Sequence, residues 1–110
     1  EVNMTSETVI RAVAFQEGDA WVVQGIEYDI AAHAWEPADL PAAFMRAVVD
    51  NVIITESLGR RALEGIKPAP DRFREMFDRA RAQVVATDSV TPAQLPVGGV
   101  NIRLATASAV

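Results

Sequence analysis

The chain has 110 residues, of which 50% are hydrophobic and 23% are charged, a composition typical of one folded domain and not of a disordered chain. It contains no cysteine, which excludes disulfide frameworks, thiolate metal sites and cysteine nucleophiles. The net charge of −5 is uneven, because residues 1–57 hold ten acids and two bases whereas residues 58–110 hold five acids and eight bases. This acidic front half argues against nucleic-acid binding and favours a basic protein partner.

No apolar run is long enough to cross a membrane, and the N-terminal residues lack the pattern of a secretion signal. We therefore expect a cytoplasmic protein without a membrane span.

The first predicted elements are three consecutive strands. Residues 8–15 alternate between two faces, and the following "QEGD" supplies a turn in which Gly18 can take a positive φ. The second and third arms are predicted over residues 21–27 and 29–35. In the third arm, one face carries Ile30, Ala32 and Ala34, and the opposite face carries Ala31, His33 and Trp35. These arms predict an antiparallel meander.

A long helix is predicted next. Asp39 is its expected N-cap, Pro41 lies in its first turn, and Gly59 is the expected residue just after its end. Its apolar stripe is wider than one sheet face can cover, so part of it is expected to meet a second subunit or another element of the chain. We predict a homodimer or higher homo-oligomer with Met45, Val49 and Ile53 in the interface.

The "GIKPAP" segment at 65–70 predicts a break, after which a second helix begins near Asp71. Its expected buried stripe contains Phe73, Met76, Phe77, Ala80 and Val84. Residues 87–99 are typical of a linker. A last strand is possible within residues 99–107, where it would complete the sheet or swap onto a neighbouring chain, and a frayed tail is the alternative.

Together these elements predict an α+β fold of the order β-β-β-α-(α/β). The expected sheet has three to four antiparallel strands packed against the main helix in two layers, with the second helix beside the first. The predicted domain spans residues 8–86, and residues 87–110 form a linker and C-terminal tail.

The sequence specifies no reaction. Phosphate-binding loops, dinucleotide fingerprints and paired zinc-binding histidines are all absent. Glu27 and Asp29 could share one face and bind a hard cation with His33, but two acids at this spacing are common on solvated strands. Trp21 and Trp35 are interpreted as core or interface aromatics, because no basic residues are interleaved with them. We expect no cofactor, no metal and no enzyme activity.

The stretch "EGDAWVVQGIEYDIAAHA" at 17–34, the helix near Asp39 and the "PAP..F...F" pattern at 68–77 resemble the HicB-like antitoxin family. The resemblance covers roughly residues 9–82 and implies a compact α+β domain that neutralises a small basic RNA-cleaving toxin by direct binding. Two features depart from the family pattern: His33 stands where relatives often have glutamine, and "HAWEPAD" replaces a glycine-containing turn. Residues 87–110 leave no room for the DNA-binding segment of full antitoxins.

The resemblance and the acidic charge together predict a partner-binding surface in the region 17–35. Its expected residues are Glu17, Asp19, Tyr28, Asp29, His33 and Trp35. Two alternatives stay open. The chain could be an orphan HicB-like oligomer with another role, or a metal-dependent RNase H-like nuclease using Glu27, Asp29 and His33.

Overall fold

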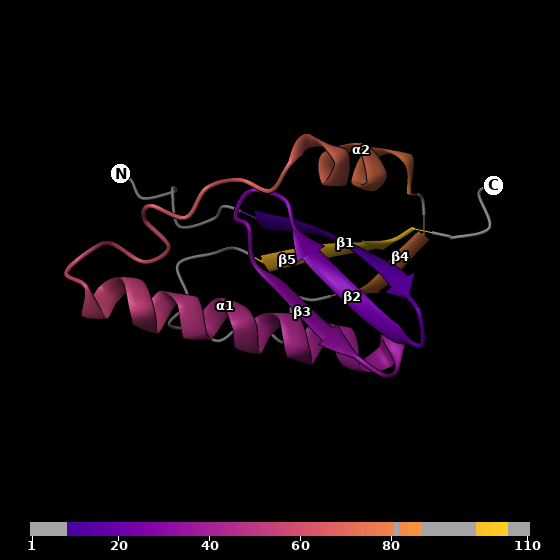
Figure 1. Cartoon of the computed structure of the whole chain (residues 1–110), viewed down its shortest axis with the longest axis horizontal. Coiled ribbons are helices and arrows are strands. Elements are labelled where there is room, and N and C mark those ends of the chain that lie inside the picture. The colour runs from indigo at the N-terminus through magenta and orange to yellow at the C-terminus, as the bar shows by residue number, and fades with distance from the viewer. Residues whose placement is uncertain (1–8, 81, 87–98, 106–110) are drawn as a thin grey trace.

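The computed structural model describes residues 9–80, 82–86 and 99–105. The strands form one sheet in the order β3-β2-β1-β5-β4, and the two helices α1 and α2 lie on opposite sides of it (Figure 1). The predicted α+β class, with the main helix packed on the sheet, is confirmed. In chain order the elements are β1 (Val9–Glu17), β2 (Ala20–Gly25), β3 (Ala31–Ala34), a 3₁₀ turn η2 (Pro37–Asp39), α1 (Leu40–Ser57), α2 (Asp71–Arg79), β4 (Ala82–Ala86) and β5 (Gly99–Leu104).

The predicted meander is present in β1, β2 and β3, which pair in antiparallel fashion. Glu17 lies opposite Ala20, so the hairpin turn consists of two residues, Gly18 and Asp19. Gly18 has a φ of 64°, which glycine adopts without the steric cost that a side chain would add. The turn therefore fixes the register of β1 against β2, and with it the face on which each side chain lies.

The sheet is mixed, which corrects the prediction of a wholly antiparallel sheet of three to four strands. β5 runs parallel to β1 and antiparallel to β4, so the sheet has five strands. The possible last strand is present as β5, and it lies inside the sheet between β1 and β4. The predicted linker, apart from Gly99, lies outside the described residues. Local alternation cannot predict the parallel pairing, because it depends on where the chain returns after its crossover.

The C-terminal end of α1 has the geometry that the sequence predicts, whereas its N-terminal end lacks the predicted capping hydrogen bond. Gly59 follows the helix with a φ of 80°, as expected for the residue after a C-cap. Asp39 holds the N-cap position, but its φ of −90° and ψ of −6° are helical and its side chain makes no capping hydrogen bond. The reason is that η2 leads the chain directly into α1, so no extended N-cap residue is needed.

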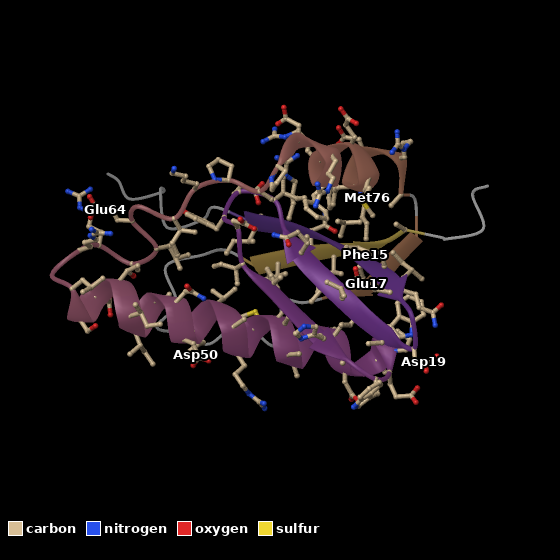
Figure 2. The ribbon with its side chains drawn as sticks, in the orientation of Figure 1. Phe15, Glu17, Asp19, Asp50, Glu64 and Met76 are labelled. Carbon is tan, nitrogen blue, oxygen red and sulfur yellow. The ribbon has the colours of Figure 1, made fainter. Side chains whose placement is uncertain are left out.

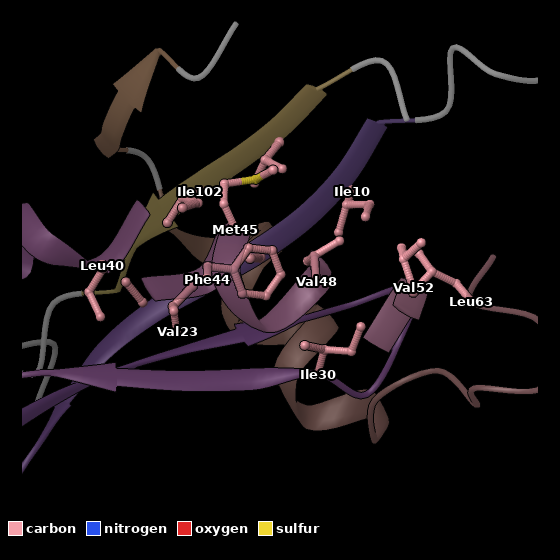
Figure 3. Close-up of a cluster of buried hydrophobic side chains, with 13 residues drawn as sticks. Ile10, Val23, Ile30, Leu40, Phe44, Met45, Val48, Val52, Leu63 and Ile102 are labelled. Carbon is pink, nitrogen blue, oxygen red and sulfur yellow. The ribbon is translucent and has the colours of Figure 1, made fainter. Parts of the chain in front are cut away.

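The main core lies between the sheet and α1 (Figure 3). Ile10 and Val23 from the strands meet Phe44 and Val48 from the helix, and all four side chains are buried. Burial of side chains of this size contributes roughly 1.5–3 kcal/mol each, so this interface holds α1 on the sheet.

The segment after α1 is fixed by one buried hydroxyl. Leu63 is 2% exposed and has a φ of 66°, an uncommon conformation for a residue with a side chain. Its N–H donates to Oγ1 of Thr55 at 2.9 Å, and the Thr55 hydroxyl can donate to the carbonyl of Asn51 or of Val52. Thr55 thus holds the returning chain against α1 while the Leu63 side chain fills the main core.

α2 covers the other face of the sheet, which corrects the prediction of two layers with the second helix beside the first. Phe77 of α2 is buried against Val13 and Ile26. The guanidinium of Arg103 lies 4.2 Å from the centroid of the Phe77 ring, and that of Arg11 lies 5.5 Å from it. The chain reaches this face by passing the bend between β2 and β3. There the Ala69 N–H donates a hydrogen bond to the Ile26 carbonyl.

Candidate functional site

The candidate site is built on β3, which forms one edge of the sheet. β3 pairs with β2 so that Ala34 lies opposite Trp21 and His33 opposite Val22. Because side chains alternate along a strand, Ala32 and Ala34 pack against the main core, whereas His33 and Trp35 point to the other face. The alternating sequence pattern predicted this division, which leaves His33 and Trp35 exposed.

A hollow of about 360 Å³ lies where β3 ends, and it is lined by Ala20, His33, Ala34 and Trp35. The Trp35 side chain is 76% exposed, more than any other large hydrophobic residue in the described part of the chain. Two of the lining residues are alanines, so their small side chains leave room beside the indole and imidazole rings. An exposed tryptophan next to a hollow can contribute strongly to a protein interface, because it buries a large area at little entropic cost.

Two acids border the hollow at the hairpin. Glu17 ends β1 opposite Ala20, and Asp19 directly precedes Ala20, so both lie at the same end of the sheet as the hollow (Figure 2). Both side chains are exposed. The structure therefore brings four of the six predicted partner-binding residues to one end of the β2–β3 pair.

The other two predicted residues, Tyr28 and Asp29, precede β3 in the chain and so lie at the end of this strand away from the hollow. Tyr28 is half-buried and packs against the main core. Asp29 is exposed, but its carboxylate accepts a hydrogen bond from Nε2 of Gln24 at 2.9 Å, and its N–H donates to the carbonyl of Lys67 at 2.7 Å. The predicted surface is therefore two separate groups, and Tyr28 and Asp29 help to shape the bend between β2 and β3.

The electrostatic character of this region is set by a long stretch without bases. Between Arg11 and Arg46 the sequence contains six acids and no lysine or arginine. Glu27 is the exception among these acids, because its carboxylate forms an ion pair with the Arg11 guanidinium. The stretch includes all of β2 and β3, which contain no acid, lysine or arginine. The acids near the hollow therefore lie in the segments that flank these strands, and no lysine or arginine accompanies them.

The alternative metal site is not assembled in this arrangement. Glu27 is engaged by both the side chain and the backbone N–H of Arg11, and Asp29 by Gln24, while His33 faces the hollow. Within residues 9–80, 82–86 and 99–105, no group of three or more histidine or carboxylate side chains is placed to hold a metal ion.

The three predicted oligomer-interface residues lie in different environments. Met45 is 6% exposed and belongs to the main core, so this part of the prediction is wrong: its side chain already packs within its own chain. Val49 is half-buried, and Ile53 is 59% exposed. Ile54 and Leu58 near the end of α1 are also exposed. The apolar residues of α1 left at the surface therefore lie toward its C-terminal end.

Ala20 and Ala34 line the hollow but were not among the predicted site residues. An alanine carries no chemical signal of its own, and its role here is to leave space. The available signal was their position, because each alanine lies next to a predicted site residue in the sequence, Asp19 in one case and Trp35 in the other.

The chain has no match among known protein families, curated proteins or solved structures. Of the helices in the described ranges, none has the length and hydropathy to cross a membrane.

Proposed function

We propose that this chain is a non-catalytic, cytoplasmic protein-binding domain whose partner is a small basic protein. The observation that carries the proposal is the hollow beside Trp35, which lies in a stretch of the chain that has acids but no bases. The resemblance to HicB-like antitoxins makes the proposed partner an RNA-cleaving toxin. Binding would then neutralise the toxin by covering its surface.

The two parts of the site have different roles in this proposal. Glu17 and Asp19 attract a basic surface at long range, which mainly raises the rate of association. Trp35 and the hollow supply contact area once the partner has docked, and a buried aromatic anchor of this kind typically dominates the affinity. The geometry supports binding over a nuclease because Glu27 and Asp29 already have partners within the chain.

The test is co-expression of the full chain with the small basic protein encoded beside its gene. We expect the two proteins to co-purify and the chain to relieve any growth arrest that the partner causes. Absence of both a complex and a rescue would refute the proposal.

Two matched charge reversals locate the surface. Asp19→Lys changes an exposed acid at the hairpin, whereas Asp50→Lys changes an exposed acid on α1, away from the hollow (Figure 2). We expect Asp19→Lys to slow association, with a reduced dependence on salt, and Asp50→Lys to have a smaller effect. Equal effects of the two reversals would mean that overall charge, and not this surface, guides binding.

A second candidate role is self-association without a toxin, which the exposed Ile53, Ile54 and Leu58 favour. Light scattering on the purified chain tests it. A dimer mass that becomes monomeric in an Ile54→Glu variant supports this role, and a monomer at high micromolar concentration excludes it.

A further inference from the structure

We propose that the open edge of β3 receives an extended basic segment of the partner, which adds to the sheet as a sixth strand. This inference rests on the proposed function and specifies how the partner binds.

The backbone hydrogen bonds determine which groups of β3 point away from the sheet. Gly25 N–H donates to the Ile30 carbonyl, and Ile26 N–H donates to the Arg11 carbonyl, both at 2.8 Å. In antiparallel pairing, successive residues alternate between the two sides of a strand. Given the register of β2 with β3, Ala32 and Ala34 bond to β2 as Ile30 does. The N–H and C=O groups of Ala31 and His33 therefore point outward.

This outward edge is open along most of β3. Ala31 and His33 are exposed, and among the turn and loop hydrogen bonds of the described residues none involves their backbone groups. At the preceding outward position, Asp29 N–H already bonds to the Lys67 carbonyl. The outward backbone N–H of Asp29 is thus bonded within the chain, whereas the outward backbone groups from Ala31 onward are open to another strand. β3 itself reads "AAHA" and lacks the lysine, proline or inward charge that commonly blocks such an edge.

Charge selects a basic segment over a second copy of this chain. Antiparallel pairing of two β3 edges would bring Asp29 of one copy near Glu36 of the other, and both side chains are exposed. The base-free stretch from 12 to 45 offers no cation to offset this repulsion. A strand bearing arginine or lysine would instead meet carboxylates at both ends of the edge.

The hollow provides a place for one side chain of the added strand. Side chains on one face of an added strand would lie beside His33 and Trp35, next to the hollow. An arginine there can lay its aliphatic stem in the hollow and its guanidinium over the exposed indole. The class of ligand is therefore an extended peptide with alternating basic residues, bound by main-chain hydrogen bonds and by one aromatic contact.

The probe is a capped heptapeptide of alternating arginine and valine, titrated into the isotope-labelled full chain and followed by NMR. We expect binding at concentrations up to the millimolar range, with slowed amide exchange at Ala31 and His33. Two control peptides, one with glutamate for arginine and one with N-methylated backbone amides, are each expected to bind at least about tenfold more weakly. Absence of binding by the arginine peptide, or equal binding by all three, would overturn the proposal.

Ala31→Pro provides the decisive variant, because proline removes the outward N–H and fills the edge while leaving the hydrogen bonds to β2 in place. Ala31→Ser keeps the N–H and is the matched control. We expect Ala31→Pro to lose at least about tenfold in affinity for the arginine peptide, with a thermal midpoint close to that of Ala31→Ser. Equal affinity of the two folded variants would overturn the proposal.

Two further outcomes separate the alternatives. A dimeric free chain with the Ala31 and His33 amides already protected would show that a second copy occupies the edge, and this would overturn the inference. If the chain forms a complex with its basic neighbour and Ala31→Pro leaves that complex unchanged, the edge inference fails while the proposed function stands. If no complex forms with the wild-type chain, the proposed function itself fails.

Discussion

Replacing Thr55 by valine tests the account of how the chain returns along α1. The side chain of Thr55 is 5% exposed, and its Oγ1 accepts the N–H of buried Leu63 at 2.9 Å. Valine has nearly the same shape and helix propensity, so the main change is the loss of this acceptor. The Leu63 N–H then stays buried without a partner, which costs about 1–3 kcal/mol. For a domain of this size that lowers Tm by roughly 4–12 °C, at about 4 °C per kcal/mol.

The assay is urea denaturation of the full chain, followed by far-UV circular dichroism and compared with a thermal melt. Ser57→Ala is the matched control, because Ser57 Oγ also donates to a carbonyl of α1, that of Ile54 at 2.7 Å, but on an exposed surface. Its expected change in the free energy of unfolding is within about 0.5 kcal/mol. If Thr55→Val is as mild as Ser57→Ala, the hydroxyl does not hold Leu63 in place and the reasoning is wrong.

Three further substitutions have defined outcomes by the same denaturation assay. Gly25→Ala is expected to cost about 1–3 kcal/mol, since its Cβ would lie 2.8 Å from the carbonyl oxygen of Tyr28; wild-type stability would contradict this close approach. Phe77→Ala is expected to cost about 3–5 kcal/mol, because the ring is 3% exposed and fills the interface under α2; a cost below about 1 kcal/mol would show that α2 is loosely packed. Trp35→Ala is expected to change stability by less than about 0.5 kcal/mol while weakening partner binding, and a strongly destabilised variant would place Trp35 in the core instead.

The local elements of the fold were predictable because their signals lie within a few residues of one another. The alternation in 8–15 placed Ile10 and Val13 on opposite faces of the strand, as the two core clusters confirm. Gly18 and Gly59 marked the turn and the helix end through their need for a positive φ.

The remaining features depend on long-range packing, which local patterns do not encode. The parallel pairing of β5 with β1 joins residues about ninety positions apart, such as Ile10 and Val100. The placement of α2 on the opposite face depends on how the chain passes Ile26 at Ala69. Met45 was assigned to an oligomer interface because the width of the apolar stripe on α1 was known and the elements covering it were not.

The candidate site was predictable in its orientation and less so in its extent. The alternation of "AAHAW" correctly placed His33 and Trp35 on the face away from the main core. It did not separate them from Tyr28 and Asp29, because the bend at 26–30 turns those residues toward other contacts. The outward direction of the Ala31 backbone required the register of β2 with β3, which the sequence alone did not provide.

The most direct test of the central claim is an NMR titration of the isotope-labelled full chain with its unlabelled small basic neighbour protein. The account predicts that the indole N–H resonance of Trp35 shifts and that the backbone amides of Ala31 and His33 become protected from exchange. The resonances of Asp50 and Glu64, which lie away from β3, should stay nearly unchanged (Figure 2). Binding that leaves Trp35, Ala31 and His33 unaffected, or no binding at all, would contradict the account.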